Sequence, residues 1–143
     1  MVTADQIVQY ARSWKGTPWR HQGRNRSGID CAGLLIVTAQ NFELPHADMR
    51  GYRRDPGKSF QDHIEEHTLP CLKPVHGAIA IFSDTNQPCH TGIFAIENGR
   101  TTIIHSEASP ARRVHEEGYD DSFPSLKSRL ISVRLFQDVD YGI

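Results

Sequence analysis

The N-terminal segment has the pattern of an amphipathic helix. Apolar residues recur there at three- and four-residue intervals, which is the spacing of one helical face. They are Ile7, Val8, Ala11 and Trp14. Thr3 and Gln6 have the spacing of a capping box, in which each side chain bonds the backbone N–H of the other residue. The helix is therefore expected to begin after Thr3 and to end near Gly16, before the extended loop that Thr17-Pro18 starts.

A second helix is expected where a long apolar run follows an acidic residue. The run begins at Cys31 and reads Cys-Ala-Gly-Leu-Leu-Ile-Val-Thr-Ala-Gln-Asn. Its length favours a buried helix ending near Phe42, although residues 34–37 alone also suit a strand. Asp30 is a good N-cap, which would place Cys31 in the first turn of this helix.

After this helix the pattern changes to short apolar runs separated by turn residues. Loop is expected at residues 45–60 and 110–126, a short helix at 61–67, and strands at 77–82, 112–115 and 130–136. Helices followed by strands indicate an α+β fold, with N-terminal helices packed on an antiparallel β-sheet. No repeat or linker divides residues 1–143, so one domain is expected.

The strongest turn signal is Asn98-Gly99, which lies between two runs rich in β-branched and apolar residues. A type I′ hairpin turn needs positive φ at both central residues, and this dipeptide is typical of it. The register that follows has three opposed pairs: Glu97 and Arg100, Phe94 and Ile103, Gly92 and His105. His90 lies two residues before Gly92 and so on the same face, which places its ring diagonal to that of His105.

This histidine pair gives Cys31 a chemical role. A thiolate nucleophile needs a base beside it and a third group that orients the base. His90 is the candidate base and His105 its orienting partner. The helix N-terminus and a nearby imidazolium are expected to lower the pKa of Cys31. The alternative is a buried core thiol, which is the more common role of a single cysteine in an apolar helix.

Composition narrows the choice of partners. The net charge of −1 over 143 residues provides no field that would attract nucleic acid or anionic lipid. A mean hydropathy of −0.50, with no apolar stretch near the ~20 residues of a spanning helix, argues against a membrane span. Three cysteines do not suggest a disulfide framework, and no secretory signal is visible. Synthesis in a reducing cytoplasm is therefore expected.

These residues resemble the NlpC/P60 cysteine peptidases, and more narrowly the branch found in phage tails and prophages. The resemblance rests on the blocks Gly16-Thr-Pro-Trp-Arg-His-Gln-Gly, Gly28-Ile-Asp-Cys-Ala-Gly-Leu, His90-Thr-Gly-Ile-Phe and Ile104-His105-Ser. The blocks stand in the order found in the family and cover most of the chain, from about residue 4 to residue 110. With both histidine blocks at this spacing the signature is specific.

The resemblance implies a papain-like NlpC/P60 fold with a triad of Cys31 as nucleophile, His90 as base and His105 as the residue that orients the base. It implies hydrolysis of the peptide stems of bacterial peptidoglycan, typically at the bond between D-γ-glutamate and a diamino acid, without a metal or an organic cofactor. The expected partners are a stem peptide or muropeptide and phage-tail or delivery-device proteins. The protein would then be associated with a virion tail or delivered to the cell wall.

Two positions depart from the family pattern. Relatives usually have a tyrosine at the position of Trp19, and its hydroxyl is a hydrogen-bond donor near the oxyanion. In this chain that donor would have to come from Trp19 or His21. Many relatives have a serine where this chain has Ala32, which bears on recognition of the amino end of the stem. Asp30 matches the family, and two roles remain open for it: a helix cap alone, or a cap that also meets a substrate amine.

Two other functions remain open. The same fold and cysteine serve amidases and lipid-directed acyltransferases, although the lipid-directed relatives commonly place the histidine before the cysteine. Trp19 and Ala32 also leave room for a non-catalytic module that binds cell wall or a tail partner.

A zinc site is the alternative use of the other cysteines. Cys71, His76, Cys89 and His90 have the ligand types that zinc prefers. Adjacent residues on a strand point to opposite faces, however, so Cys89 and His90 would not easily share one metal. The remaining histidines are expected mostly at the surface: His46, His63, His67 and His115, together with His21, which lies near the cysteine block.

Overall fold

The computed structural model describes residues 1–48, 51–52, 58–84, 87–122 and 125–143. Its helices and strands are β1 (Val2–Thr3), α1 (Ala4–Arg12), β2 (Arg24–Asn25), β3 (Gly28–Ile29), α2 (Cys31–Asn41), α3 (Lys58–Glu66), β4 (Thr68–Cys71), β5 (Ile79–Asp84), β6 (Gln87–Glu97), β7 (Arg100–Glu107), β8 (Arg113–Gly118), the 3₁₀-helix η1 (Lys127–Arg129), β9 (Leu130–Phe136) and β10 (Val139–Asp140).

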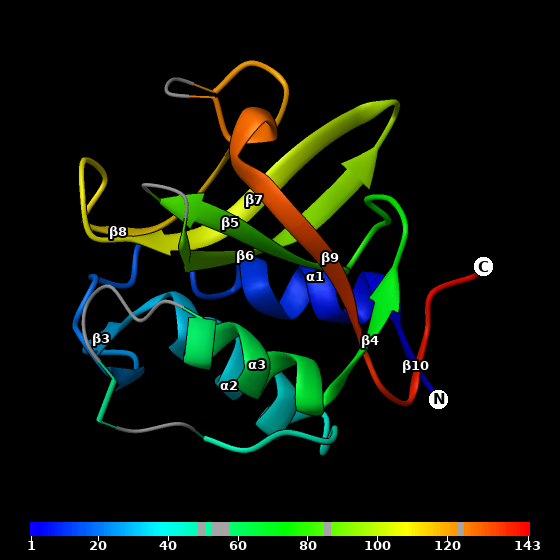
Figure 1. The fold of residues 1–143 in the computed structure, drawn as a ribbon, viewed down its shortest axis with the longest axis horizontal. Helices are drawn as coiled ribbons and strands as arrows, with labels where there is room; N and C mark the ends of the chain where they lie inside the picture. The colour runs from blue at the N-terminus through cyan, green and yellow to red at the C-terminus, as the bar shows by residue number, and fades with distance from the viewer. Residues whose placement is uncertain (49–50, 53–57, 85–86, 123–124) are drawn as a thin grey trace.

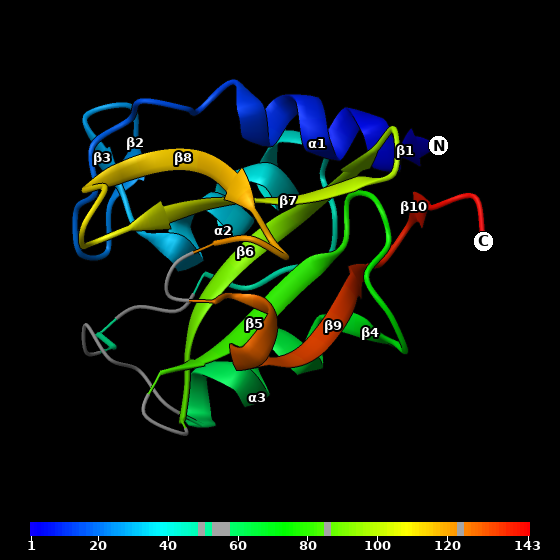
Figure 2. The same cartoon turned by 90° about the horizontal axis from the view of Figure 1, so that it is seen from above.

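A six-stranded antiparallel sheet organises the molecule, in the order β4-β9-β5-β6-β7-β8. The three α-helices lie along one side of this sheet, and η1 lies on the other side (Figure 1). All three helices contact the long strand β6, and the view in Figure 2 shows α2 behind β6 and β7. Among the described helices, none is both long and apolar enough to cross a membrane. An antiparallel sheet with the α-helices along one side is an α+β fold, as the sequence predicts.

Alternating residues of the sheet enter two separate apolar clusters. Ile79 and Ile81 of β5 pack with the helices, together with Ile93 of β6 and Leu34 of α2. The alternate residues of β5, Ala80 and Phe82, enter the second cluster on the opposite face. This follows from the period of two along a strand, and it explains why these strands are apolar at nearly every position. The residues of β6 and β7 that belong to these two clusters are thus held by packing on both faces of the sheet.

The two N-terminal predictions about helix starts are confirmed. Thr3 caps α1, and both hydrogen bonds of its capping box with Gln6 are present. Asp30 caps α2, and Cys31 is the first helical residue. The first helix ends earlier than expected, at Arg12, because residues 13–16 form turns that finish at Gly16 with φ +90°.

The hairpin prediction is also confirmed. Asn98 and Gly99 have φ of 53° and 77°, the positive values that a type I′ turn requires. Glu97 pairs with Arg100 and Phe94 with Ile103, as the register demands. Gly92 lies against His105, where a Cβ added to the glycine would come within 3.2 Å of the Cβ of the histidine.

The remaining elements match the predictions in part. The strand at 130–136 has the expected bounds, whereas α3 begins at Lys58 inside the predicted loop, and β8 continues to Gly118. The sequence does not predict β4, because Pro70 lacks the N–H of a ladder residue and argues against a strand. Since β4 lies at the edge of the described sheet and pairs there with β9, the sheet tolerates this proline. The expected loop at 45–60 includes residues 49–50 and 53–57, which lie outside the described residues.

Candidate active site

The amino end of α2 positions Cys31. One carboxylate oxygen of Asp30 accepts a hydrogen bond from the backbone N–H of Gly33 at 2.8 Å, which satisfies one of the free donors of the first turn. The carbonyl of Asp30 accepts from the N–H of Leu34. Cys31 is partly buried, while the rest of the first turns of α2 is packed into the core. The cap thereby fixes the direction in which α2 presents its first side chain.

Asp30 is also the centre of a buried charge network. Its side chain is 5% exposed and accepts from the guanidinium of Arg24 at 2.9 Å, from the backbone N–H of Gln22 at 2.8 Å and from the hydroxyl of Tyr52. The guanidinium of Arg24 further binds Asp48 at 3.0 Å. These bonds occupy both carboxylate oxygens of Asp30, so the helix-cap role predicted from the sequence is observed. A role toward a substrate amine stays a prediction.

The environment of Cys31 disfavours its thiolate. Burial, with the nearby negative charge of Asp30 next in importance, raises the pKa of the Cys31 thiol to about 11. Hydrogen bonds with the backbone of Thr91 and the backbone of Ala32 oppose this shift without cancelling it. The predicted lowering of this pKa is therefore wrong in direction, because desolvation outweighs the helix terminus. The contacts with Thr91 also bring Cys31 against β6, one residue from His90.

His90 and His105 meet as the hairpin register predicts. Nε2 of His90 lies 2.6 Å from Nδ1 of His105, and the two rings form an edge contact with centroids 4.9 Å apart. His105 is completely buried, and His90 stacks on Phe82, its partner across β5 and β6. Burial, with the adjacent His105 next in importance, holds the pKa of His90 well below its usual range. His90 is thus neutral at neutral pH.

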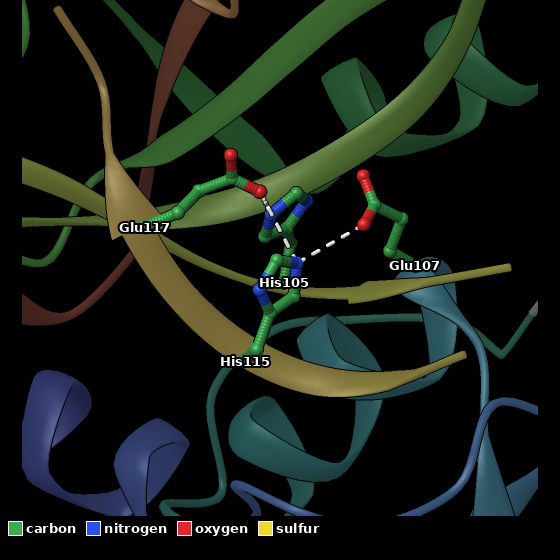
Figure 3. A group of neighbouring side chains, drawn as sticks. All are labelled: His105, Glu107, His115 and Glu117. Carbon is green, nitrogen blue, oxygen red and sulfur yellow. Dashed lines mark hydrogen bonds and ion pairs between the residues drawn. The ribbon is translucent and has the colours of Figure 1, made fainter. Parts of the chain in front are cut away.

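The series of hydrogen-bonded polar side chains continues from His105 to residues of β8. The sequence does not predict this continuation. Nε2 of His105 lies 2.8 Å from a carboxylate oxygen of Glu117, and its ring stacks on that of His115 with centroids 4.6 Å apart. Glu107 completes the group, as Figure 3 shows. His115 is therefore not simply a surface residue. The available signal is the repeated His-x-Glu in His105-Ser-Glu107 and His115-Glu-Glu117, whose ends share one face of paired strands.

Trp19 and His21 lie on the loop that leads to β2. Their rings stack with centroids 6.4 Å apart, and His21 makes an edge contact with Tyr52. The backbone N–H of Trp19 donates to the carbonyl of Arg112 at 2.9 Å, so the loop is attached beside β8. Ala32 is buried against Tyr52. Both departures from the family pattern are therefore near the start of α2, and their roles at an oxyanion or a substrate stay predictions.

The described residues of the proposed zinc set are not brought together as ligands. His76 uses both ring nitrogens: Nε2 bonds Asp5 at 2.9 Å, and Nδ1 accepts from the N–H of Ile96 at 2.9 Å. The thiol of Cys71 donates to the carbonyl of Lys73 at 3.2 Å. The side chain of Cys89 lies outside the described residues. In the part of the chain that the structure describes, the groups close enough to share a metal ion involve other residues.

Comparison of the sequence with known proteins gives a short but clear match. No family model matches the chain. The probable endopeptidase NlpC of Escherichia coli strain K12 is 47% identical over 34 residues, which are 23% of this chain and 22% of that protein. The match therefore supports a local likeness and leaves most of both proteins outside the alignment.

Comparison of the structure covers nearly the whole chain. An NlpC/P60 family protein from Bacillus cereus ATCC 10987 superposes with a TM-score of 0.70 at 18% identity, over 94% of this chain and 40% of that one. NlpC2 from Trichomonas vaginalis gives a TM-score of 0.69 at 16% identity, over 93% of this chain and 46% of that one. The chain thus spans less than half the length of these two proteins.

A third structure is similar in size as well as in fold. The NlpC/p60 domain of the peptidoglycan hydrolase SagA superposes with a TM-score of 0.60 at 16% identity, over 94% of this chain and 98% of the domain. Identities this low establish the fold alone. The α+β, papain-like fold of this chain is that of the NlpC/P60 domains.

Proposed function

We propose that this protein is an NlpC/P60-type cysteine peptidase that hydrolyses the peptide stems of bacterial peptidoglycan. The observation that carries the proposal is a hydrogen-bonded series of three side chains, His90, His105 and Glu117. The Cys31 thiol contacts β6 beside His90. The fold is consistent with it, and so is the short match to a probable endopeptidase. A core thiol alone would not account for this hydrogen-bonded series of polar groups, of which His105 is completely buried.

The proton positions follow from the acceptor at the end of this series. A carboxylate only accepts hydrogen bonds, so Glu117 requires the proton of neutral His105 to be on Nε2. Nδ1 of His105 then carries a lone pair and accepts a hydrogen bond from Nε2–H of His90. This leaves Nδ1 of His90 as the unprotonated nitrogen, which is the state a general base needs.

In the first step, the sulfur of Cys31 attacks the scissile carbonyl while Nδ1 of His90 takes the thiol proton. The resting pair is neutral, because burial favours the thiol of Cys31 and the unprotonated ring of His90. Charge separation therefore accompanies attack rather than preceding it. His90 becomes an imidazolium that donates through Nε2 to His105, and Glu117 faces the far side of that ring. The imidazolium then protonates the departing amine, which leaves a thioester on Cys31.

In the second step, water attacks the thioester and His90 accepts its proton. The tetrahedral intermediate expels the Cys31 sulfur, which regains the proton from His90, and a free carboxylic acid leaves. Backbone N–H groups at the start of α2 are the proposed oxyanion donors, with the indole N–H of Trp19 or the ring of His21 as additional ones. The N–H of Gly33 is not available for this role, because it donates to Asp30.

The choice of bond and the delivery route are finer parts of the proposal. The sequence blocks around Cys31, His90 and His105 favour the bond between D-γ-glutamate and a diamino acid. The likeness of these blocks to phage-tail relatives favours a tail or another delivery device as the route to the wall.

Digestion of defined muropeptides tests the substrate. The purified chain is incubated with disaccharide tripeptide and tetrapeptide muropeptides and, separately, with a lipid ester, and mass spectrometry identifies the products. We expect cleavage after D-γ-glutamate, with a free amine on the diamino-acid fragment, and no release from the ester. Cleavage of the ester alone would favour an acyltransferase or lipase-type role. Binding of muropeptide without any product would favour the non-catalytic module.

A further inference from the structure

Four side chains converge on one face of β7 and β8. No step of the proposed hydrolysis needs them as a group. His105 and His115 are direct cross-strand partners, and Glu107 and Glu117 lie two residues beyond them on the same face. One ring nitrogen of each histidine and one oxygen of each glutamate lie within 4.8 Å of one another. Figure 3 shows all four pointing into one small volume between the two strands.

Three of the separations between the candidate ligand atoms are close to those of a small tetrahedral metal site, and the others are at most 4.8 Å. Nε2 of His115 lies 3.2 Å from an oxygen of Glu107 and 3.1 Å from an oxygen of Glu117. Nε2 of His105 lies 2.8 Å from that oxygen of Glu117. Ligands bound to Zn²⁺ at its usual distances are about 3.3 Å apart in a tetrahedron. Two imidazoles and two carboxylates therefore need only small side-chain shifts to surround such an ion.

The charges of the group also call for a cation. Glu107 is partly buried on β7, with its side chain 19% exposed. Its carboxylate faces that of Glu117 across the two imidazoles. Within the described part of the chain, the buried Nε2 of His115 makes no hydrogen bond of acceptable geometry, although two carboxylates lie close to it. A divalent ion between them would satisfy this nitrogen and both carboxylates.

We propose that His105, Glu107, His115 and Glu117 bind a divalent transition-metal ion, with Zn²⁺ as the best match, and that the bound ion inhibits the enzyme. Zinc accepts imidazole and carboxylate ligands together, and four ligands complete its usual tetrahedral coordination. All four ligands come from two hydrogen-bonded strands, so the backbone already holds them in place.

Inhibition follows from the two nitrogens of His105, and this half of the proposal rests on the proposed function. A metal ion on Nε2 of His105 displaces the proton there, so neutral His105 must carry its proton on Nδ1. That proton points at Nε2 of His90, 2.6 Å away, and makes His90 accept rather than donate. If His90 were then protonated, its Nε2–H would point at the Nδ1–H of His105, and two donors would face each other without an acceptor. The ion thus disfavours the protonated His90 that attack by Cys31 produces.

Metal binding is tested without reference to activity. Zn²⁺ is titrated calorimetrically into the Cys31→Ser variant, which removes the Cys31 thiol as a competing ligand, and Co²⁺ is followed by its visible absorption. We expect one ion per chain. Affinity should fall by at least about tenfold in Cys31→Ser combined with His115→Ala, and also in Cys31→Ser combined with Glu107→Gln, a nearly isosteric change. Both variants are first checked for folding by circular dichroism.

The matched control is His67→Ala in the same background, because His63, Glu66 and His67 form the other described group close enough to bind a metal. The site would be overturned if His67→Ala abolished binding, or if neither His115→Ala nor Glu107→Gln weakened it.

The inhibition is tested on the chain with Cys31 present. Muropeptide hydrolysis is measured with Zn²⁺ and with a chelator, and each variant is compared with its own metal-free rate. Zinc should inhibit the unmodified chain more strongly than His115→Ala. Equal inhibition of both would place the inhibitory ion elsewhere. The calorimetric result stands even if no hydrolysis is detected.

Discussion

The two halves of the candidate site are built in different ways. On the helix side, Cys31 is held by a cap and a buried ion pair that involve Asp30 and Arg24. On the sheet side, His90 and His105 are held by the register of a hairpin whose turn is two residues long. The helix side is fixed by buried hydrogen bonds to Asp30, whose negative charge lies near the thiol. The sheet side is a chain of hydrogen bonds along which protons can be redistributed.

This difference determines the resting state of the site. Burial and Asp30 keep the Cys31 thiol protonated, while burial keeps the ring of His90 neutral. The sheet side has the acceptor for the new proton and a polar chain behind it. Catalysis in this account therefore depends on proton transfer during attack, and the following predictions test each side separately.

The largest expected effect is the loss of the base. His90→Ala should lower kcat for muropeptide hydrolysis by about 10²- to 10⁴-fold, because nothing would take the thiol proton. Thermal unfolding should change much less than activity. His46→Ala is the control, since His46 bonds only the carbonyl of Leu44 among the described contacts. Activity in His90→Ala equal to that of His46→Ala would remove His90 from the mechanism.

The next effect concerns stability on the helix side. Asp30→Ala should lower the free energy of unfolding by about 3–5 kcal/mol, because it leaves the guanidinium of Arg24 buried without its main partner. Asp48→Ala is the matched control. It removes another carboxylate from the same arginine, but the Asp48 side chain is 22% exposed against 5% for Asp30, so its cost should be smaller. Urea unfolding measures both, and equal costs would mean that the buried network does not anchor α2.

The reactivity of Cys31 against pH tests the electrostatics of the helix side. A pKa of about 11, compared with an ordinary value of 9.0 for an exposed thiol, means roughly a hundredfold less thiolate at neutral pH than in an exposed cysteine. Iodoacetamide should therefore alkylate Cys31 about a hundredfold more slowly than a cysteine peptide at pH 7, with a rate that rises toward pH 11. Peptide mapping distinguishes Cys31 from Cys71 and Cys89. Rapid alkylation that persists at acidic pH would instead indicate a preformed thiolate–imidazolium pair.

The smallest effect is expected for the orienting residue. His105→Ala should reduce kcat by about tenfold to a hundredfold, which is less than His90→Ala, because His90 keeps its stacking contact with Phe82. KM should change little, since His105 is completely buried and does not reach a substrate. Full activity of this variant would show that His105 does not orient the base.

Local signals in the sequence were sufficient for the parts of the site that depend on short spacings. The cap by Asp30, the position of Cys31 in the first turn and the pairing of His90 with His105 all follow from residues near one another. The Asn98-Gly99 turn made the hairpin register predictable over many residues, because side-chain facing has a period of two.

Features that depend on distant segments could not be predicted in this way. The position of Glu117 beside His105 requires the pairing of β7 with β8, and the turn-rich segment between them does not specify that register. The raised pKa of Cys31 depends on how deeply α2 is buried, which is a tertiary property. The edge strand β4 was hidden by Pro70, which is tolerated only because of its place at the rim of the sheet.

The most direct test of the central claim compares muropeptide hydrolysis by Cys31→Ala with that by Cys71→Ala, after confirming that both fold. Cys71 lies on β4, away from the histidine pair in the sheet, and its removal controls for the loss of a thiol. The account predicts that Cys31→Ala lowers the rate by at least about 10³-fold and that Cys71→Ala retains it. Hydrolysis that survives in Cys31→Ala would contradict the assignment of Cys31 as the nucleophile.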